Sequence, residues 1–531
     1  MEKFVIVDLR KNHLKILKKN CKYINIGRGS VSFDNSFEIN INKIFEKNKS
    51  FFLNQYFTNL KKNQKKWDDL FNEEKFEELE FLNSRNDKYN FFNQFIYIFC
   101  LNYFIKKKKF KYVEVITDQE LYVDLYRSLF PKIKIFIINQ NKLKIGLKKI
   151  LFIRIFFQFL KNIFLIYIIK ILFINKNISS SNLLLSIYPR FFYKKKDNFY
   201  KKNKSCFLNL TLSDGIFIHN NLFQSIKNIF EIKLTKNVIP LEKYITLGDI
   251  CKTYIKLIFN FYKAKYNFLN SMKIGNLVYT KIINQYLLES FVQRLFLNIY
   301  SEALKKVLKP DIKVFNLYCF EYSIGFYFIR KIRTINPLIK IFGHQHGIFT
   351  NKLHWFTFLN QSKNKFLYIV DKIYSQNLLS LKSYNRLNIS KDICLIKRKK
   401  YKFNFKINKK INIKNIYKVL VILGTHDAYD ILYSISSFLK DNPEKKIIFF
   451  AKCHPRIKLI INNDLTDNRL RFVNSFKGYY DLVLCSDTTT VAYDLINSKV
   501  KFKIIELNNK TNLFFSNFKN KLLINELIDK I

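Results

Sequence analysis

The chain has 531 residues, a length that allows two or three domains with sizeable hydrophobic cores. Its 93 lysine and arginine residues outnumber 40 acidic residues and give a formal net charge of +53, which suits the anionic surface of a membrane, nucleic acid, or an ordinary basic surface. The eight cysteines are scattered without a CxxC pair, which favours a reducing compartment and argues against a disulfide framework or a structural zinc site.

The N-terminal half predicts an alternation of strands and helices. Residues 3–9 form an apolar run that predicts a first strand and not a signal peptide, because it is short and lacks a cleavage site. Residues 54–108 and 250–300 have the spacing of helices. Further strands are expected at 113–117, 134–138, 183–186, 310–317, 338–342 and 366–376. This alternation is typical of a doubly wound, mostly parallel α/β fold with helical insertions in the N-terminal half.

Residues 149–174 form the most apolar segment of the chain. Arg154, Lys161 and Lys170 divide it, so no uncharged run approaches the roughly 20 residues of a spanning helix. At about 100° per residue, Arg154, Gln158, Lys161 and Asn162 fall on one face of a helix. Such a polar stripe fits two alternatives, a helix that lies on a membrane surface and a helix that packs into its own domain with the stripe outward.

The C-terminal part predicts a compact α/β unit with strands at 418–423, 446–450, 470–473, 482–485 and 501–505. Three of these strands run into polar loops. The loops contain Gly424-Thr425-His426-Asp427, Lys452-Cys453-His454-Pro455 and Ser486-Asp487-Thr488-Thr489-Thr490. Loops at the carboxyl ends of parallel strands meet at one edge of the sheet, where backbone N–H groups and hydroxyls can hold an anion.

The three loops supply groups that suit a phosphate. Lys452 and His454 place an amine and an imidazole side by side, and a glycine at 424 lets a ligand approach the backbone. The hydroxyl loop before a helix fits helix capping equally well, and the two roles can coexist. The predicted phosphate-binding residues are Gly424, Thr425, His426, Lys452, His454, Ser486, Thr488 and Thr489.

A second polar cluster follows the strands of the middle region. Glu321 lies just past the strand at 310–317, and Gly343-His344-Gln345-His346-Gly347 predicts a tight loop that presents two imidazoles to a cleft. Glu321, His344 and His346 are therefore the candidate catalytic residues. The histidines lack a compact metal-ligand spacing, and no Walker A or GxGxxG motif occurs, which argues against phosphate-loop ATPases and dinucleotide oxidoreductases.

The pattern Lys-x-His-Pro, a strand, and Ser-x-Thr-Thr before a helix resembles bacterial GT-B glycosyltransferases of surface carbohydrates. Within that group it looks most like the branch of sialyltransferases, capsular Kdo transferases and teichoic-acid polymerases. The resemblance covers roughly residues 311–507 and is only architectural upstream. Cys453 stands where these proteins often have proline, and Asp487 adds a negative charge to the hydroxyl loop.

The resemblance implies two Rossmann-like domains that face a cleft, an acceptor-side domain at 1–362 and a nucleotide-sugar-binding domain at 363–531. In such enzymes the counterparts of His454, Ser486, Thr488 and Thr489 hold the donor phosphate, and a carboxylate such as Glu321 acts as base. The expected activity is metal-independent and uses no bound cofactor. It transfers a sugar from a nucleotide sugar, with CMP-linked sugars as one candidate, to a glycan or lipid-linked glycan acceptor of a surface polysaccharide or lipopolysaccharide.

The expected location is cytoplasmic, peripheral on the inner face of the cell membrane, with an anionic membrane surface and no nucleic acid as partner. Two other functions remain open at this stage. One is a basic nucleic-acid-binding protein, although no aromatic residues interleaved with lysine mark a binding sheet. The other is a non-catalytic scaffold in envelope polysaccharide assembly.

Overall fold

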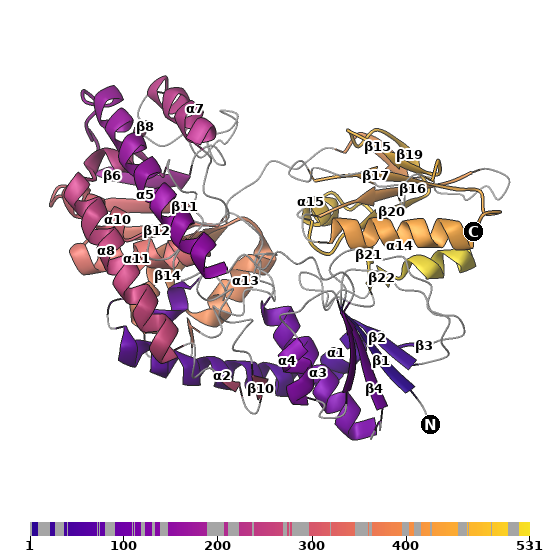
Figure 1. The fold of residues 1–531 in the computed structure, drawn as a ribbon. Coiled ribbons are helices and arrows are strands. Elements are labelled where there is room, and N and C mark those ends of the chain that lie inside the picture. Colours follow the sequence, from indigo (N-terminus) through magenta and orange to yellow (C-terminus); the bar gives the residue numbers. More distant parts are fainter. Residues whose placement is uncertain are drawn as a thin grey trace.

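The computed structural model is an α/β protein with three large parallel sheets (Figure 1). The residues that the structure describes are 3–8, 22–26, 37–39, 41–71, 73, 75–79, 91–108, 110, 112–117, 123–129, 133–137, 147–187, 206–210, 222–235, 238–268, 273–274, 277–278, 297–318, 320–345, 359–360, 364–395, 403–407, 416–424, 427–454, 465, 467–489, 491–507 and 520–530. The α/β class expected from the sequence is confirmed, with three sheets in place of two.

The first sheet has the strand order β3-β2-β1-β4-β5, all parallel. Its central strand β1 is buried from Phe4 to Asp8, in keeping with its nearly continuous apolar sequence. The strands are β1 (Lys3–Asp8), β2 (Lys22–Asn25), β3 (Phe37–Glu38), β4 (Tyr112–Thr117) and β5 (Ile133–Ile137). The accompanying helices are α1 (Ile41–Lys47), α2 (Lys49–Leu70), η1 (Phe76–Glu78), α3 (Phe91–Lys108) and α4 (Val123–Leu129).

The second sheet has the order β14-β13-β12-β11-β6-β7-β8. Its strands are β6 (Asn182–Ile187), β7 (Cys206–Leu210), β8 (Val238–Pro240), β11 (Val314–Tyr318), β12 (Lys340–His344), β13 (Val370–Ser375) and β14 (Ser390–Leu395). Its helices are α5 (Leu147–Leu172), α7 (Leu222–Lys233), η5 (Leu241–Tyr244), α8 (Leu247–Lys263), η6 (Ala264–Phe268), α10 (Ile299–Val307), α11 (Ser323–Ile335), η8 (Lys365–Tyr368) and α13 (Leu378–Leu387). Two short strands, β9 (Lys273–Ile274) and β10 (Leu277–Val278), pair antiparallel nearby in sequence.

The third sheet has the order β18-β17-β16-β20-β21-β22. Its strands are β16 (Tyr417–Ile422), β17 (Ile447–Lys452), β18 (Leu470–Phe472), β20 (Leu482–Cys485), β21 (Lys503–Ile505) and β22 (Lys521–Leu522). Its helices are α14 (Ala428–Asp441), α15 (Val491–Asn497) and η10 (Ile524–Lys530), and a separate parallel pair is formed by β15 (Phe405–Ile407) and β19 (Gly478–Tyr480).

The three sheets share one topology. In each, the first strand to appear in sequence is central, the next two strands extend the sheet on one side, and the later strands extend it on the other. The order reverses between β1 and β4, between β6 and β11, and between β16 and β20. Ligands of open α/β sheets bind outside the carboxyl ends of the strands at such a reversal. The topology therefore defines three places to search for a site.

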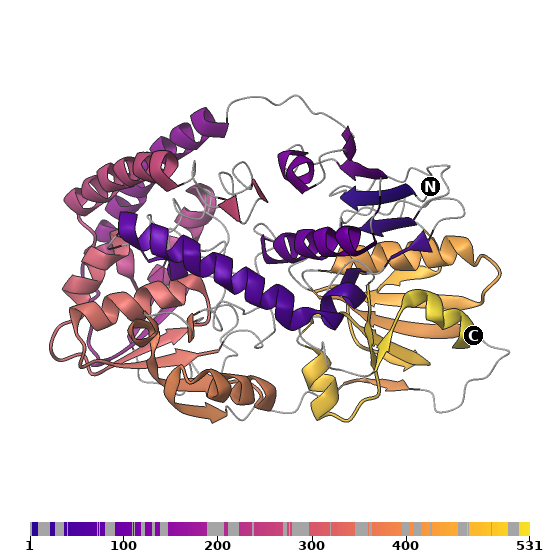
Figure 2. The same ribbon diagram turned by 90° about the horizontal axis from the view of Figure 1, so that it is seen from below.

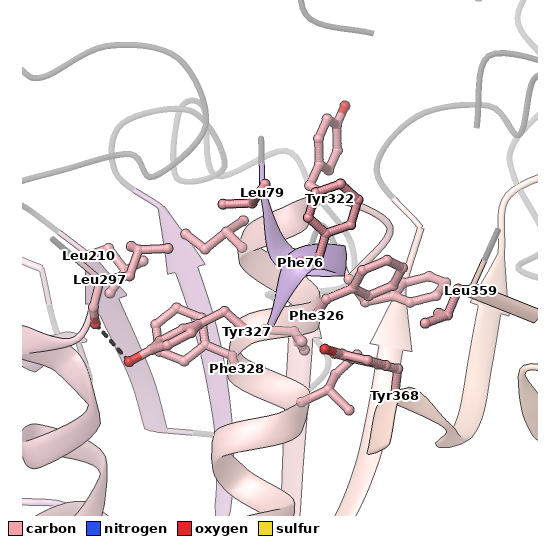
Figure 3. Close-up of a cluster of buried hydrophobic side chains, with 14 of the residues drawn as sticks. Phe76, Leu79, Leu210, Leu297, Tyr322, Phe326, Tyr327, Phe328, Leu359 and Tyr368 are labelled. Atoms are coloured by element: carbon pink, nitrogen blue, oxygen red, sulfur yellow. Dashed lines mark hydrogen bonds between the residues drawn. The ribbon is translucent and has the colours of Figure 1, made fainter. Parts of the chain in front are cut away.

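The first and second sheets are joined through one buried core that runs from Phe4 to Ile389. Helix α2 contacts α3 beside the first sheet and η6 beside the second (Figure 2). The short helix η1 inserts Phe76 against α11, close to Phe326 and Tyr368 (Figure 3). Next to this apolar cluster, the buried Arg330 side chain donates to Glu78 through Nε at 2.5 Å and Nη2 at 3.0 Å.

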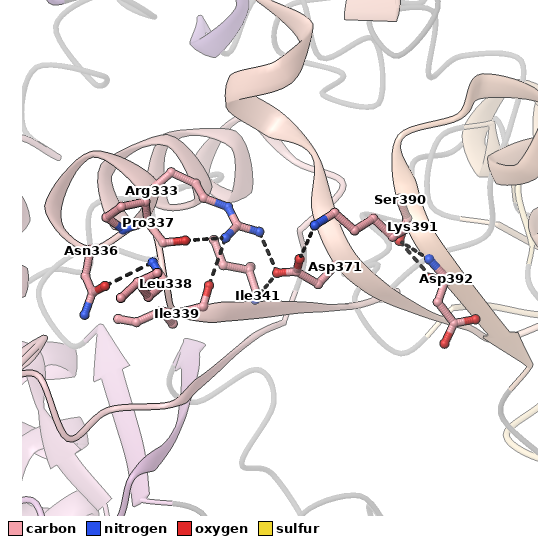
Figure 4. Close-up of polar contacts among 10 residues, drawn as sticks. All are labelled: Arg333, Asn336, Pro337, Leu338, Ile339, Ile341, Asp371, Ser390, Lys391 and Asp392. Atoms are coloured by element: carbon pink, nitrogen blue, oxygen red, sulfur yellow. Dashed lines mark hydrogen bonds and ion pairs between the residues drawn. The ribbon is translucent and has the colours of Figure 1, made fainter.

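The expected domain boundary at residue 363 does not fit the strand pairing. Strand β13 lies beyond that position, yet it pairs in parallel with β12 and extends the second sheet. A polar network also crosses the position, because Asp371 accepts from the Ile341 N–H at 2.8 Å and from Arg333 at 2.5 Å, and it pairs with Lys391 at 3.4 Å (Figure 4). The second sheet ends only with β14, and the separate buried cores of the C-terminal unit begin at Phe405.

Helix α5 confirms the helix expected at 149–174, but the described part of its polar stripe, Gln158, Lys161 and Asn162, is partly or fully buried; the Arg154 side chain lies outside the described residues. Asn162 is buried and donates to the Tyr254 hydroxyl of α8 at 3.2 Å, and it accepts from Gln158 at 3.0 Å. Lys161 is half-buried, and burial lowers the pKa of its amine to about 8. Another face of the helix exposes large apolar side chains, including Phe157 (63% exposed), to solvent. Gln158 and Asn162 thus form hydrogen bonds on the side of the helix that faces the protein, and an apolar face is exposed to solvent.

Candidate functional site

The candidate site lies at the carboxyl edge of the third sheet. Ile422 at the end of β16 pairs with Lys452 of β17 on one side and with Cys485 of β20 on the other. The loops that follow these three strands therefore start side by side, about 4.8 Å apart. This is the arrangement that the sequence predicts, and it falls at the reversal of strand order between β16 and β20.

Gly424 brings the loop after β16 into contact with the hydroxyl loop after β20. A Cβ atom at this position would lie 1.9 Å from Thr488 Oγ1 and 2.5 Å from Ser486 Oγ. Any side chain would push these hydroxyls away. The absence of a side chain here thus serves close packing between two loops of the protein.

The Asp427 carboxylate accepts hydrogen bonds from the hydroxyls of the loop after β20. Its Oδ1 atom lies 2.6 Å from Ser486 Oγ and 2.7 Å from Thr488 Oγ1, and the two hydroxyl oxygens are 2.9 Å apart. Each hydroxyl has one proton, so two of these three contacts are hydrogen bonds at any time. The backbone N–H of Thr488 also donates to Ser486 Oγ at 2.9 Å. Asp427 is 4% exposed and holds the loop from inside.

This network divides the expected phosphate contacts into two groups. Ser486 is fully buried, and Thr489 is buried with its hydroxyl accepting from the Val491 N–H of α15 at 3.4 Å, so both side chains shape the loop from within. Asp487 is buried as well. Thr488, Lys452 and His454 keep part of their side chains at the surface of this edge. Thr425 and His426 lie outside the described residues.

The loop after β17 is anchored through its backbone. The Leu423 N–H donates to the Lys452 carbonyl at 3.0 Å, which leaves the lysine side chain at the end of the strand. Burial raises the pKa of the neighbouring Cys453 thiol, an effect that the Lys452 charge opposes. The thiol therefore stays protonated at neutral pH, and Lys452 and His454 are the groups of this loop that suit an anion.

His344 belongs to the interior of the second sheet, contrary to the loop expected from the sequence. It is the last residue of β12, is 2% exposed, and stacks on Tyr374 with ring centroids 4.6 Å apart. Gly343 lies in the same strand, where a Cβ atom would stand 2.7 Å from the Phe320 ring. The glycine makes room for this ring and does not form a tight turn. His346 lies outside the described residues.

The His344 imidazole is held by Asn316 of β11. Asn316 donates its amide to Asn182 Oδ1 at 2.6 Å and to the Leu183 carbonyl at 3.2 Å, so its own Oδ1 accepts from His344 Nε2 at 3.0 Å. Burial lowers the pKa of His344 to about 3, so the ring is neutral, with its proton on Nε2. Such a ring fixes the register of three neighbouring strands.

Glu321 and Gln345 are also buried near the carboxyl edge of the second sheet. Gln345 donates to Ser380 Oγ at 2.8 Å and accepts from Ser375 Oγ at 3.0 Å, which ties the end of β12 to β13 and α13. Sequence reasoning missed Gln345, Asn316 and Asp427 as organising residues. Asp427 and Gln345 had a signal, because each stands in a polar motif that follows a strand, whereas Asn316 lies inside a strand without one.

Across the part of the chain that the structure describes, no three His, Cys, Asp or Glu side chains gather in a way that could hold a metal ion. Among the described helices, none combines the length and the apolar character that crossing a bilayer requires. Comparison of the sequence with protein-family models and with curated proteins gives no match. The chemistry of the site therefore has to be argued from its own residues.

Proposed function

We propose that the chain is a glycosyltransferase that moves a sugar from a nucleotide-sugar donor to a surface-polysaccharide or lipopolysaccharide acceptor. The observation that carries the proposal is the convergence of three polar loops at the strand reversal of the third sheet. The parallel topology, the basic residue at the strand end and the hydroxyl loop are what binding of a phosphate at such an edge requires.

In this proposal Lys452, His454 and Thr488 contact the donor phosphates. Transfer of the sugar leaves negative charge on the phosphate, and a lysine amine and an imidazole N–H at fixed positions stabilise that charge as it develops. Asp427 and Ser486 act as positioning residues, because they hold the Thr488 loop without reaching the surface.

The burial of Glu321 and His344 argues against proton transfer at either residue. A general base must reach the acceptor hydroxyl within hydrogen-bond distance, whereas Glu321 is fully buried and His344 is neutral and bonded to Asn316. We assign both residues to shaping the carboxyl edge of the second sheet. The remaining catalytic candidate of the sequence, His346, lies outside the described residues.

The test is a calorimetric binding measurement with a panel of nucleotide sugars, including a CMP-linked sugar, on full-length protein. Lys452→Ala should weaken donor binding about tenfold or more, as expected for loss of a charge-assisted contact. Lys446→Ala is the matched control, because Lys446 is exposed directly before the opposite end of the same strand. The proposal fails if no nucleotide sugar binds, if both variants bind like the wild type, or if the protein instead binds single-stranded DNA with a steep salt dependence.

A further inference from the structure

The outer face of α5 is an unusually apolar surface. Seven of its large side chains are at least 45% exposed, and at 100° per residue they fall within an arc of about 80° to 100°. They are Ile153, Phe156, Phe157, Leu160, Phe164, Tyr167 and Ile171. A helix that belonged only to the protein core would turn this face inward, so the exposed face calls for another environment.

Two neighbouring helices expose similar faces. Helix α8 and the following η6 expose five side chains on one side, and α7 together with the residue that follows it exposes three on one side. These are Ile255, Ile258, Phe259, Tyr262 and Tyr266 of α8 and η6, and Phe223, Phe230 and Leu234 at α7. Helix α5 packs against both α7 and α8. We call the exposed apolar side chains of these three helices the platform; Figure 1 shows where the helices themselves lie.

Specific side-chain contacts hold the three helices of the platform together. Phe159 of α5 meets Tyr254 of α8 edge to face at 4.7 Å, below the Asn162 hydrogen bond to the same tyrosine. Lys176, just after α5, donates to the carbonyls of Lys233 and Thr235 at the end of α7, at 3.0 Å and 2.9 Å. The polar contacts lie between the helices, and the large apolar groups lie outside.

The three helices of the platform are rich in basic residues. Helix α5 contains five basic and no acidic residues, α7 contains two basic and one acidic residue, and α8 contains three basic and one acidic residue. Lysine can keep its amine at the polar level while its stem lies along an apolar surface. Aromatic side chains between lysines are typical of helices that lie in the interface of an anionic bilayer.

The α8 part of the platform also contains a hollow of about 580 Å3. Phe259, Tyr262, Lys263 and Tyr266 are among its lining residues. Its wall is mainly apolar and includes one lysine, so it suits a segment of acyl chain with a phosphate headgroup. A soluble partner would have to match both the apolar faces and the dense positive charge, whereas an anionic lipid surface supplies both.

We propose that the platform of α5, α7 and α8 lies on the surface of an anionic lipid bilayer and inserts its aromatic side chains among the lipids. The proposal does not depend on glycosyl transfer, because it uses no residue of the third sheet. Attachment by three helices would also fix how the second sheet is oriented toward the membrane.

The experiment measures co-sedimentation of the full-length protein with phosphatidylcholine vesicles that contain 0 or roughly a third phosphatidylserine. The wild type should bind the anionic vesicles and bind the neutral ones much more weakly. The triple variant Phe157→Ser, Phe164→Ser, Phe259→Ser should lower the partition coefficient at least about tenfold, because three large side chains lose their burial in lipid. All three are at least half exposed, so folding should be retained.

The matched control removes three equally exposed aromatic rings elsewhere, with Tyr112→Ser, Phe366→Ser and Tyr479→Ser. It should bind vesicles like the wild type. Equal binding to neutral and anionic vesicles, an equal loss in the control, or no vesicle binding at all would overturn the proposal. So would a dimer in sedimentation velocity that disappears only in the platform variant, since a second copy of the chain would then cover this surface.

Discussion

At the scale of single residues, Gly424 and Asp427 organise the candidate site from within. The sequence pattern correctly brought the loops after β16, β17 and β20 to one edge, because parallel strands end together. It could not show which loop side chains turn inward, since that depends on the path of each loop. Ser486 and Thr489 were therefore expected as ligand contacts, although both are buried.

Gly424→Ala should destabilise the protein by about 1–3 kcal/mol and weaken nucleotide-sugar binding, because the new Cβ overlaps the two hydroxyls. Urea denaturation and calorimetry measure the two effects. Gly248→Ala is the control: its Cβ would meet nothing closer than Thr246 Oγ1 at 3.8 Å, and alanine in helix α8 should be neutral or stabilise by up to about 1 kcal/mol. Equal effects of the two substitutions would refute the packing role of Gly424.

Asp68, in the last turn of α2, makes the stability of the folded protein depend on pH. Burial, together with the nearby Glu77, raises the pKa of its carboxyl to about 6. The folded chain then holds this proton more tightly than the unfolded chain, so wild-type stability falls as the pH rises from about 4 to 6.

Asp68→Asn should remove this loss. Since Asp68 is half-buried and solvent screens part of the penalty, we expect a gain of about 1 kcal/mol at pH 7 and no difference below about pH 4. Urea denaturation across this pH range, with Asp69→Asn at the adjacent exposed position as control, measures the effect. A gain that is independent of pH would contradict the assignment.

At the scale of elements, apolar periodicity located the long strands and helices but not their orientation. In α5 the pattern separated a polar from an apolar face, and the alternative of a helix packed into its own domain put the polar stripe outward. In the structure Asn162 of that stripe lies toward α8 and donates to Tyr254, while large apolar side chains of the helix are exposed. Such pairing joins residues 92 positions apart and has no local signature. Short edge strands such as β3 and β22 were missed for a related reason, since two residues carry no periodicity.

The Glu78–Arg330 pair links η1 to α11 and can be tested by a double-mutant cycle. Arg330→Met should cost about 3–5 kcal/mol, because it leaves a fully buried carboxylate without its partner. Adding Glu78→Gln should restore a large part of the loss in urea denaturation. The exposed pair of Lys305 and Glu302 provides the comparison, where Lys305→Met should change stability by less than about 1 kcal/mol. Additive effects of the two changes at 78 and 330 would show that the pair is not coupled.

At the scale of the whole molecule, the described residues form one core that spans the first two sheets and separate cores in the third unit. The sequence predicted the α/β class and most of the strands. It missed the division of the N-terminal half into two sheets and set the boundary at 363, because strand sequences do not tell which sheet a strand joins. The sequence of strand β13 is equally compatible with the start of a new domain and with an extension of the second sheet, where the structure places it.

Separate cores should unfold separately. Trp67 is buried in the first core, so in a Trp355→Phe background tryptophan fluorescence follows that core alone, while circular dichroism follows the whole chain. Ile329→Ala should shift the fluorescence transition, whereas Ile431→Ala should shift only part of the dichroism transition, each by about 2–5 kcal/mol. Coincident transitions in both variants would show a single cooperative unit.

The pairing of Glu78 with Arg330 can form only late in the synthesis of the chain. The two residues are 252 positions apart, so at about 5–20 residues per second the ribosome reaches Arg330 roughly 13 to 50 seconds after Glu78. Each sheet grows outward from its earliest strand, and the first sheet can be complete while α11 is still unmade. Until then Glu78 lacks its arginine partner, and Phe76 can pack against Trp67 of α2 but not against α11. The side of η1 that faces α11 therefore stays exposed on the nascent chain until α11 has been made.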